Sequence, residues 1–135
     1  MDQTFALTRA ADAQRLDFDW GYLLWYASGP QNSSDHVTVG RCVLKAGCTN
    51  PKHYHPNCEE VLHVLSGRIE HFVEGRGWFE MSQGDTITIA QDTWHNARNI
   101  GEDEAHLLIC FSSKDRRTIG EDNAASTQPG KAPHG

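Results

Sequence analysis

The chain has 135 residues and a net charge of −6 with neutral histidines, so it is long enough for one domain and too acidic to favour nucleic acid or an anionic membrane as a partner. No apolar run reaches the length of a membrane span, and the N-terminus lacks the basic start and apolar block of a signal peptide. The four cysteines form no C-x-x-C pair, and without an export signal they predict free thiols in a cytoplasmic protein.

The expected elements begin with an N-terminal arm, residues 1–30, in which "LTRAADAQRL" can form a short helix. Residues 31–115 are expected to form a barrel of short strands bounded by glycine, asparagine, aspartate or serine. In chain order, these strands are "HVTVGRCVL", "EEVLHVLSG", "RIEHFVEG", "GWFEMSQG", "DTITIA" and "AHLLICFSS". Residues 116–135 are rich in small and polar residues and are expected to form a flexible tail. Short strands at close spacing without a helical period predict an all-β sandwich or barrel.

Two histidines and a glutamate in "HYHPNCEE" are the first signal for chemistry. His53 and His55 lie two positions apart, so in an extended segment both imidazoles point to one face and can reach the same ion. Glu60 begins the next expected strand, and the turn before it can return its carboxylate toward that ion. Imidazole and carboxylate ligands suit Zn, Fe, Mn, Ni or Cu. The competing interpretation is a polar loop with exposed histidines, because H-x-H alone is common.

The surrounding glycines make the stretch resemble the first signature of the cupin family. That signature runs glycine, five residues, H-x-H, three or four residues, glutamate, six residues, glycine. The matching positions here are Gly47, His53, His55, Glu60 and Gly67. The spacing to the second glycine selects Glu60 over Glu59.

The second cupin signature is similar to "GDTITIAQDTWHNARN", which supplies Gly84, His95 and Asn99 at the expected distances. The stretch departs from the signature at two positions: Ala90 replaces a proline and Asp92 replaces a glycine. Both belong to the turn before the histidine, so they affect the turn more than the ligand. Aspartate is tolerated in the left-handed conformation that a glycine would adopt there.

The resemblance implies a double-stranded β-helix, or jelly-roll, cupin barrel that binds one divalent transition metal: Zn, Fe, Mn or Ni. The implied ligands are His53, His55, Glu60 and His95. Three imidazoles and one carboxylate leave coordination positions open for water and substrate. The resemblance also implies a small-molecule substrate and a homodimer, in which outward apolar residues such as Val61 and Leu65 would be covered.

Other polar residues have two interpretations. His71 could face the pocket as an acid–base group or be a partly exposed strand histidine. Arg41 could meet a substrate carboxylate if its face lines the barrel, and is otherwise a solvated strand charge. Alternation from Glu60 places His63 on the face opposite the metal, and Asn99 is expected to fix a turn.

The preferred function is a metal-dependent enzyme with Lewis-acid isomerase, lyase or cyclase chemistry on an oxygen-rich substrate such as a sugar acid, a keto-acid or a polyketide-like molecule. An Fe(II) dioxygenase uses the same ligands, although Cys48 and Cys58 beside them would be exposed to oxidants. A non-catalytic small-molecule-binding cupin is the third possibility. Cupin lyases that cleave dimethylsulfoniopropionate tend to carry a tyrosine two residues after the ligand glutamate, where this chain has Leu62.

Overall fold

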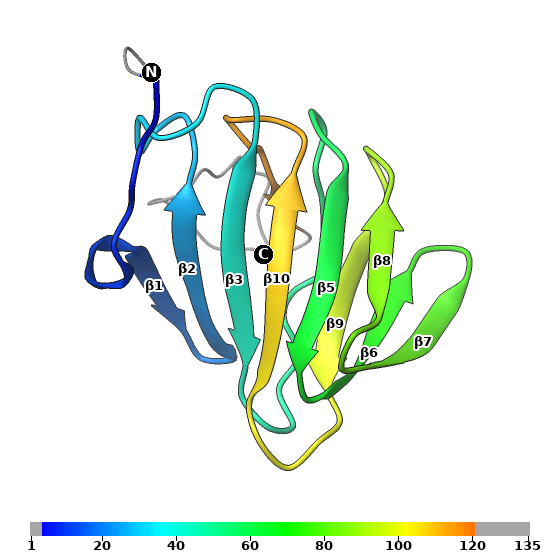
Figure 1. Ribbon diagram of the computed structural model, residues 1–135. Helices are drawn as coiled ribbons and strands as arrows, with labels where there is room; N and C mark the ends of the chain where they lie inside the picture. Colours follow the sequence, from blue (N-terminus) through cyan, green and yellow to red (C-terminus); the bar gives the residue numbers. More distant parts are fainter. Residues whose placement is uncertain (1–3, 121–135) are drawn as a thin grey trace.

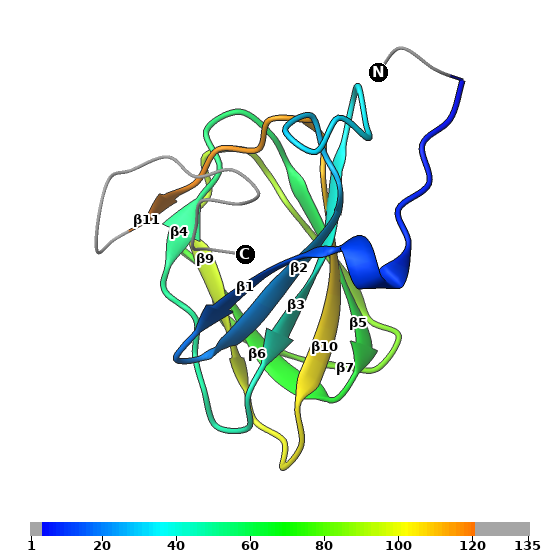
Figure 2. The ribbon, with the colours of Figure 1, turned by 90° about the vertical axis from the view of Figure 1, so that its left-hand side faces the viewer.

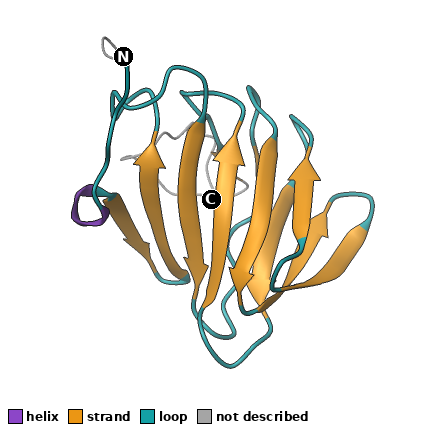
Figure 3. Cartoon of the chain, viewed as in Figure 1, coloured by secondary structure: helices purple, strands orange, loops and turns teal. Residues whose placement is uncertain are grey.

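The structure is a computed structural model that describes residues 4–120 of the chain. Its secondary structure is almost entirely β (Figure 3), with one short 3₁₀ turn, η1, at Ala10–Asp12. The larger sheet consists, in spatial order, of β1 (Gln14–Phe18), β2 (Gly21–Ala27), β3 (Thr38–Leu44), β10 (Ala105–Phe111), β5 (Glu60–Ser66) and β8 (Thr86–Ile89). The smaller sheet consists of β11 (Ile119–Gly120), β4 (His53–Tyr54), β9 (His95–Asn99), β6 (Arg68–Val73) and β7 (Gly77–Ser82).

The two sheets face each other and enclose one core, which is the expected jelly-roll architecture (Figure 1). All paired strands are antiparallel, and most neighbours lie far apart in the sequence, as where β10 separates β3 from β5. Figure 2 shows β11, β4 and β9 across the barrel from β10 and β5. Because the two signatures contribute strands to both sheets, the fold brings them together inside the barrel.

Alternation along the strands decides which side chains form the core. In β10, Leu107, Ile109 and Phe111 are buried, and the residues between them are half-buried on the outer face. The wide ring of Trp25 crosses the inner face of the larger sheet beside Gly40. A Cβ atom at Gly40 would lie 2.5 Å from that ring, so only glycine leaves room for it.

The barrel extends beyond both of the boundaries, residues 31 and 115, that the sequence predicts. Residues 14–27, inside the range 1–30 expected as an arm, form β1 and β2 and extend the larger sheet. The reason is the apolar alternation of "GYLLWYA", which buries Leu23 and Trp25 completely. Residues 116–120, expected as the start of the tail, pass over the barrel and add β11 beside β4. Residues 121–135 of the expected tail lie outside the described residues.

The turn before His95 resolves the departure from the second signature. Asp92 has a φ of 66°, so it adopts the left-handed conformation expected of the glycine it replaces. Its backbone N–H donates a hydrogen bond of 3.0 Å to the carbonyl of His55, which ties the two signatures together. Within residues 4–120, no helix has the length and apolarity needed to cross a membrane.

Candidate metal centre

Four side chains meet between the two sheets: His53 from β4, His55 just after it, Glu60 from the start of β5 and His95 from the start of β9. Each is between 0 and 2 % exposed. His53 and His95 are paired residues of adjacent strands, and Glu60 reaches them from the opposite sheet. The structure therefore brings together all four side chains that the sequence analysis selected.

The distances are those of a compact donor cluster. One potential ligand atom from each residue lies within 4.8 Å of those of the other three. The Oε1 atom of Glu60 lies 3.1 Å from Nε2 of His55 and 2.9 Å from Nε2 of His95. Imidazole and carboxylate together are donors suited to a divalent transition metal.

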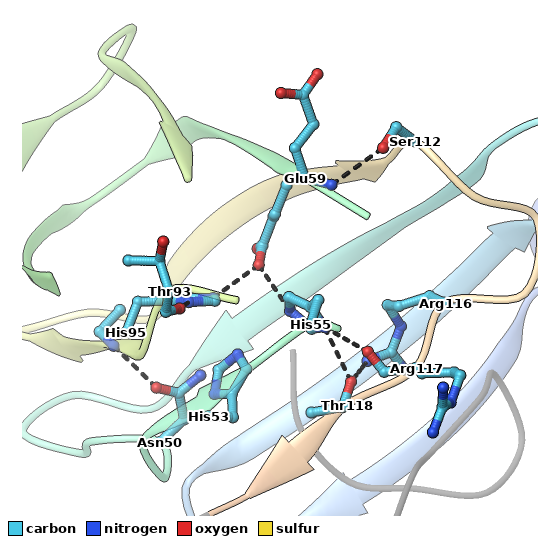
Figure 4. A network of polar contacts seen from close by, with 12 residues as sticks. Asn50, His53, His55, Glu59, Thr93, His95, Ser112, Arg116, Arg117 and Thr118 are labelled. Carbon is cyan, nitrogen blue, oxygen red and sulfur yellow. Dashed lines mark hydrogen bonds and ion pairs between the residues drawn. The ribbon is translucent and has the colours of Figure 1, made fainter. Parts of the chain in front are cut away.

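Backbone carbonyls fix the tautomer of each imidazole (Figure 4). The Nδ1 atom of His53 lies 2.7 Å from the carbonyl oxygen of Pro51, and that of His95 lies 2.8 Å from the carbonyl of Thr93. The Nδ1 atom of His55 lies 2.9 Å from the carbonyl of Arg117. A carbonyl can only accept, so each Nδ1 carries the proton and each Nε2 presents a lone pair. Carbonyl partners of this kind orient metal-binding imidazoles in proteins.

The charges within the cluster also suit a cation. Burial lowers the pKa of His53 and His55, so both imidazoles are neutral at pH 7. Burial raises the pKa of Glu60, and hydrogen bonds from His55 and His95 outweigh burial and lower that pKa well below its usual range. Those hydrogen bonds need a proton at Nε2, whereas the carbonyl partners place the proton of each neutral ring at Nδ1 and leave two Nε2 lone pairs about 3 Å from the carboxylate. Such acceptors attract one another only through a proton or a cation between them, and the donor set thus fits a bound metal ion.

A small cavity adjoins the cluster, with a volume of about 10 Å³. This is room for about one water-sized particle. Its walls are apolar on one side, where Leu62, Leu107 and Ile109 lie, and polar where His71 meets the candidate ligands. The His71 ring stacks on that of His95 at 5.6 Å, with 12° between their planes. Burial, with a contribution from His95, lowers the pKa of His71 to about 4.

The two candidate catalytic residues lie in different places. His71 is buried and lines the cavity, so its side chain faces the pocket and is not a partly exposed strand histidine. Arg41 does not reach the site, and its suggested role with a substrate is corrected. The side chain of Cys42 lines the cavity, so Arg41 points to the outer face of β3, where its Nη1 lies 3.4 Å from Nδ1 of His106.

Three further expectations are met. Asn99 holds a turn: its Nδ2 donates to the carbonyls of Leu44 at 2.9 Å and Asp103 at 2.8 Å, and its Oδ1 accepts from the N–H of Gly101 at 2.9 Å. His63 lies on the outer face, where its Nδ1 is 2.7 Å from the hydroxyl of Thr86. All four cysteines are free thiols.

The sequence analysis missed the segment that follows β10. Arg116 and Thr118 are completely buried beside His55, and the carbonyl of Arg117 holds the His55 ring. The available signal was the Arg116–Arg117 pair directly after the last expected strand. Adjacent arginines ordinarily indicate a solvated segment, so only the packing of the strands reveals that one of them is enclosed.

A sequence model described as "Cupin domain" matches residues 40–111. Germin-like protein 3-8 of Oryza sativa subsp. japonica is 33% identical over 82 residues, which are 58% of this chain and 36% of that protein. Polyketide synthase CurC of Streptomyces cyaneus is 31% identical over 74 residues, 55% of this chain and 47% of that protein. Oxalate oxidase 1 of Hordeum vulgare is 26% identical over 95 residues, 65% of this chain and 47% of that protein. The chain thus spans between 36% and 47% of the length of these curated relatives.

Solved structures share the fold at lower identity. An oxalate decarboxylase of Bacillus subtilis superposes with a TM-score of 0.77 at 19% identity, over 84% of this chain and 31% of that one. The oxalate decarboxylase of Lactobacillus farciminis in a formate complex gives a TM-score of 0.76 at 19% identity, over 83% of this chain and 34% of that one. These similarities establish the fold of the barrel.

Proposed function

This chain belongs to the cupin family, and we propose that it is a metal-dependent enzyme acting on a small, oxygen-rich molecule. The proposed ligands of one divalent metal, Zn, Fe, Mn or Ni, are His53, His55, Glu60 and His95. The observation that carries the proposal is one buried donor cluster of three imidazoles, each oriented at Nδ1 by a backbone carbonyl, and a single carboxylate, with one ligand atom of each residue within 4.8 Å of the others.

A divalent ion held there supplies Lewis acidity to a carbonyl or enolate oxygen. The residues of the chain then have distinct roles. The four ligands hold the charge in place, and the apolar walls formed by Leu62, Leu107 and Ile109 exclude bulk water. His71 is the proposed acid–base residue, because it lines the cavity next to the ligands, and its lowered pKa of about 4 keeps the ring neutral at pH 7.

Proton transfer next to a polarised carbonyl gives isomerase, lyase or cyclase chemistry. The proposed substrates are sugar acids, keto-acids or polyketide-like molecules, whose neighbouring oxygens can chelate one metal ion. The relative that supports a polyketide-like substrate is polyketide synthase CurC. The chain covers 47% of that protein, so the substrate is a proposal that needs a direct assay.

The experiment has a metal arm and a reaction arm. Elemental analysis of the purified protein should find about one transition-metal ion per chain, and His53→Ala and His95→Ala should each lose it. His36→Ala, an exposed histidine outside the cluster, is the matched control. With a panel of uronates, keto-acids and β-diketones, proton NMR in D₂O should show metal-dependent exchange or rearrangement that His71→Phe abolishes while metal content stays the same. Full metal content in both alanine variants would refute the ligand assignment.

Oxidative chemistry is the second candidate, and the similarity to the oxalate oxidase of barley supports it. The oxalate decarboxylase of Bacillus subtilis carries Mn(II) centres, although its similarity to this chain establishes only the fold. The expected vulnerability of Cys58 to oxidants is reduced, because burial raises the pKa of its thiol to about 12 and keeps it protonated. Oxygen consumption with oxalate or a catechol, absent after chelator treatment, would select this candidate. A metal-loaded protein inactive in both assays would favour a binding function.

A further inference from the structure

The loop between two of the candidate ligands is held by a part of the chain that is distant in sequence. Residues 56–59 join His55 to Glu60 and belong to no strand. Beside them lies the segment that follows β10, residues 112–118, which we call the strap. The strap leads from the end of β10 across the end of the barrel to β11 (Figure 2). The positions of two of the four candidate ligands therefore depend on how this loop is fixed to the strap.

Asn57 joins the loop to the strap by two hydrogen bonds. Its Nδ2 donates to the carbonyl of Asp115 at 2.9 Å, and its Oδ1 accepts from the N–H of Arg117 at 3.0 Å. The side-chain amide thus pairs with one backbone acceptor and one backbone donor of the strap. His55 makes a parallel contact, because its Nδ1 donates to the carbonyl of Arg117 at 2.9 Å. The backbone of Arg117 is therefore held by Asn57 through its N–H and by a candidate ligand through its carbonyl.

A second pair of contacts fixes the loop where it enters β5. The N–H of Glu59 donates to the hydroxyl of Ser112 at 3.0 Å (Figure 4), and the N–H of Ser112 donates to the carbonyl of Glu59 at 3.2 Å. Glu59 immediately precedes Glu60, so these bonds set the point at which the ligand carboxylate leaves the backbone. The strap thus holds the loop next to both candidate ligands.

The strap is itself anchored to the chain between β2 and β3. The buried Thr38 donates its hydroxyl proton to the carbonyl of Ser113 at 2.8 Å. The N–H of Gly29 donates to the carbonyl of Lys114 at 2.9 Å. A Cβ atom at Gly29 would lie 2.9 Å from Oδ1 of Asp115, so the strap lies close against this turn. Contacts on two sides make the strap a fixed template for the loop.

Ordering a loop costs conformational entropy, so a metal ion binds more tightly when its ligands are already in place. We propose that Asn57 is a positioning residue of the metal centre, because its two bonds to the strap hold His55 and Glu60 in place for the ion. The inference rests on the proposed function and deepens it by naming a residue that sets the metal affinity of the site. The coupling is reciprocal, so an ion bound by the loop should stabilise the strap through Asn57.

The first test measures metal binding by the full chain. Asn57→Ala removes both hydrogen bonds and keeps all four candidate ligands. In competition with a chromophoric chelator, it should bind Co(II) about tenfold more weakly than the parent. Its visible Co(II) absorption should also change, because that absorption reports the arrangement of the ligands. Asn99→Ala is the matched control, since Asn99 makes three hydrogen bonds in a turn without ligands. It should lower the Tm, keep the parent absorption and leave the Co(II) affinity within about threefold of the parent.

The second test measures the reciprocal effect in the parent and needs no variant. The reporter is the N–H of Arg117, which donates to Asn57. Its exchange with D₂O, followed by NMR, should slow by about tenfold when the diamagnetic ion Zn(II) is added. The control is the N–H of Asp85, which donates to the carbonyl of Ser82 at 2.9 Å in the turn between β7 and β8. Its exchange should be the same with and without Zn(II).

Three results would each overturn the inference. They are an unchanged Co(II) affinity in Asn57→Ala, an equal loss of affinity in Asn57→Ala and Asn99→Ala, and exchange at Arg117 that Zn(II) does not alter. If Asn57→Ala does not fold, Asn57→Leu provides the second variant, and the exchange measurement on the parent still decides. If the parent binds neither Co(II) nor Zn(II), the proposed function fails, whereas metal binding without these effects refutes only the role of Asn57.

Discussion

Acid should destabilise the metal-free protein through His71 in particular, and His71→Phe should remove that contribution. The pKa of His71 is lowered from an ordinary 6.5 to about 4, chiefly by burial and also by His95. Below pH 6.5 the unfolded chain therefore takes up a proton that the folded chain refuses. The stability contributed by the neutral ring is complete above the unfolded pKa and is lost as the pH falls toward 4.

The magnitude follows from the two pKa values. Each pKa unit corresponds to about 1.4 kcal/mol, so lowering the pH from 7 to 4.5 should remove about 2 to 3 kcal/mol of the unfolding free energy through His71 alone. For 135 residues, the unfolding entropy is about 0.28 kcal/mol/K, so the loss corresponds to a fall in Tm of about 8 °C. His53 and His55 have lowered pKa values and add losses of the same sign, so the readout is the difference between parent and variant.

The assay is urea-induced unfolding, followed by tryptophan fluorescence at several pH values between 7 and 4.5 with a chelator present. The parent should lose about 2 to 3 kcal/mol more than His71→Phe over this range, whatever their difference at pH 7. His36→Gln is the matched control, because His36 lies in solvent and its replacement should leave the pH dependence of the parent intact. Parallel curves for the parent and His71→Phe would refute the buried, neutral state of His71.

Three further predictions concern the turns and the outer face. Asn99→Asp should cost about 2 to 3 kcal/mol in urea unfolding, because it loses two donated hydrogen bonds and turns a carboxylate toward the carbonyls of Leu44 and Asp103; no loss would contradict the turn assignment. Asp92→Val should cost about 1 to 2 kcal/mol at its φ of 66°, whereas Asp92→Gly should be close to neutral, and equal stabilities would contradict the strain. Light scattering after gel filtration should give twice the chain mass of 15.1 kDa, and Val61→Asp on the half-buried outer face of β5 should lower it; a parent monomer would contradict the homodimer.

The sequence alone selected the four side chains that meet in the barrel. Their selection depends on local spacing: alternation places His53 and His55 on one face, and the interval to Gly67 chooses Glu60 over its neighbour. A second local pattern selected His95, although this chain has Asp92 where that pattern has a glycine. The structure brings these residues together, and their binding of a metal stays a prediction for elemental analysis.

Only the tertiary structure decided which other residues belong to the site. Alternation fixes the phase within one strand and is lost across each turn, so the sequence left Arg41 and His71 equally open. Strand pairing then placed Arg41 outside and His71 against His95. For Arg116 the local pattern indicated a solvated residue. Its enclosure depends on Trp25, 91 positions earlier in the chain, and burial by so distant a residue leaves no local signal.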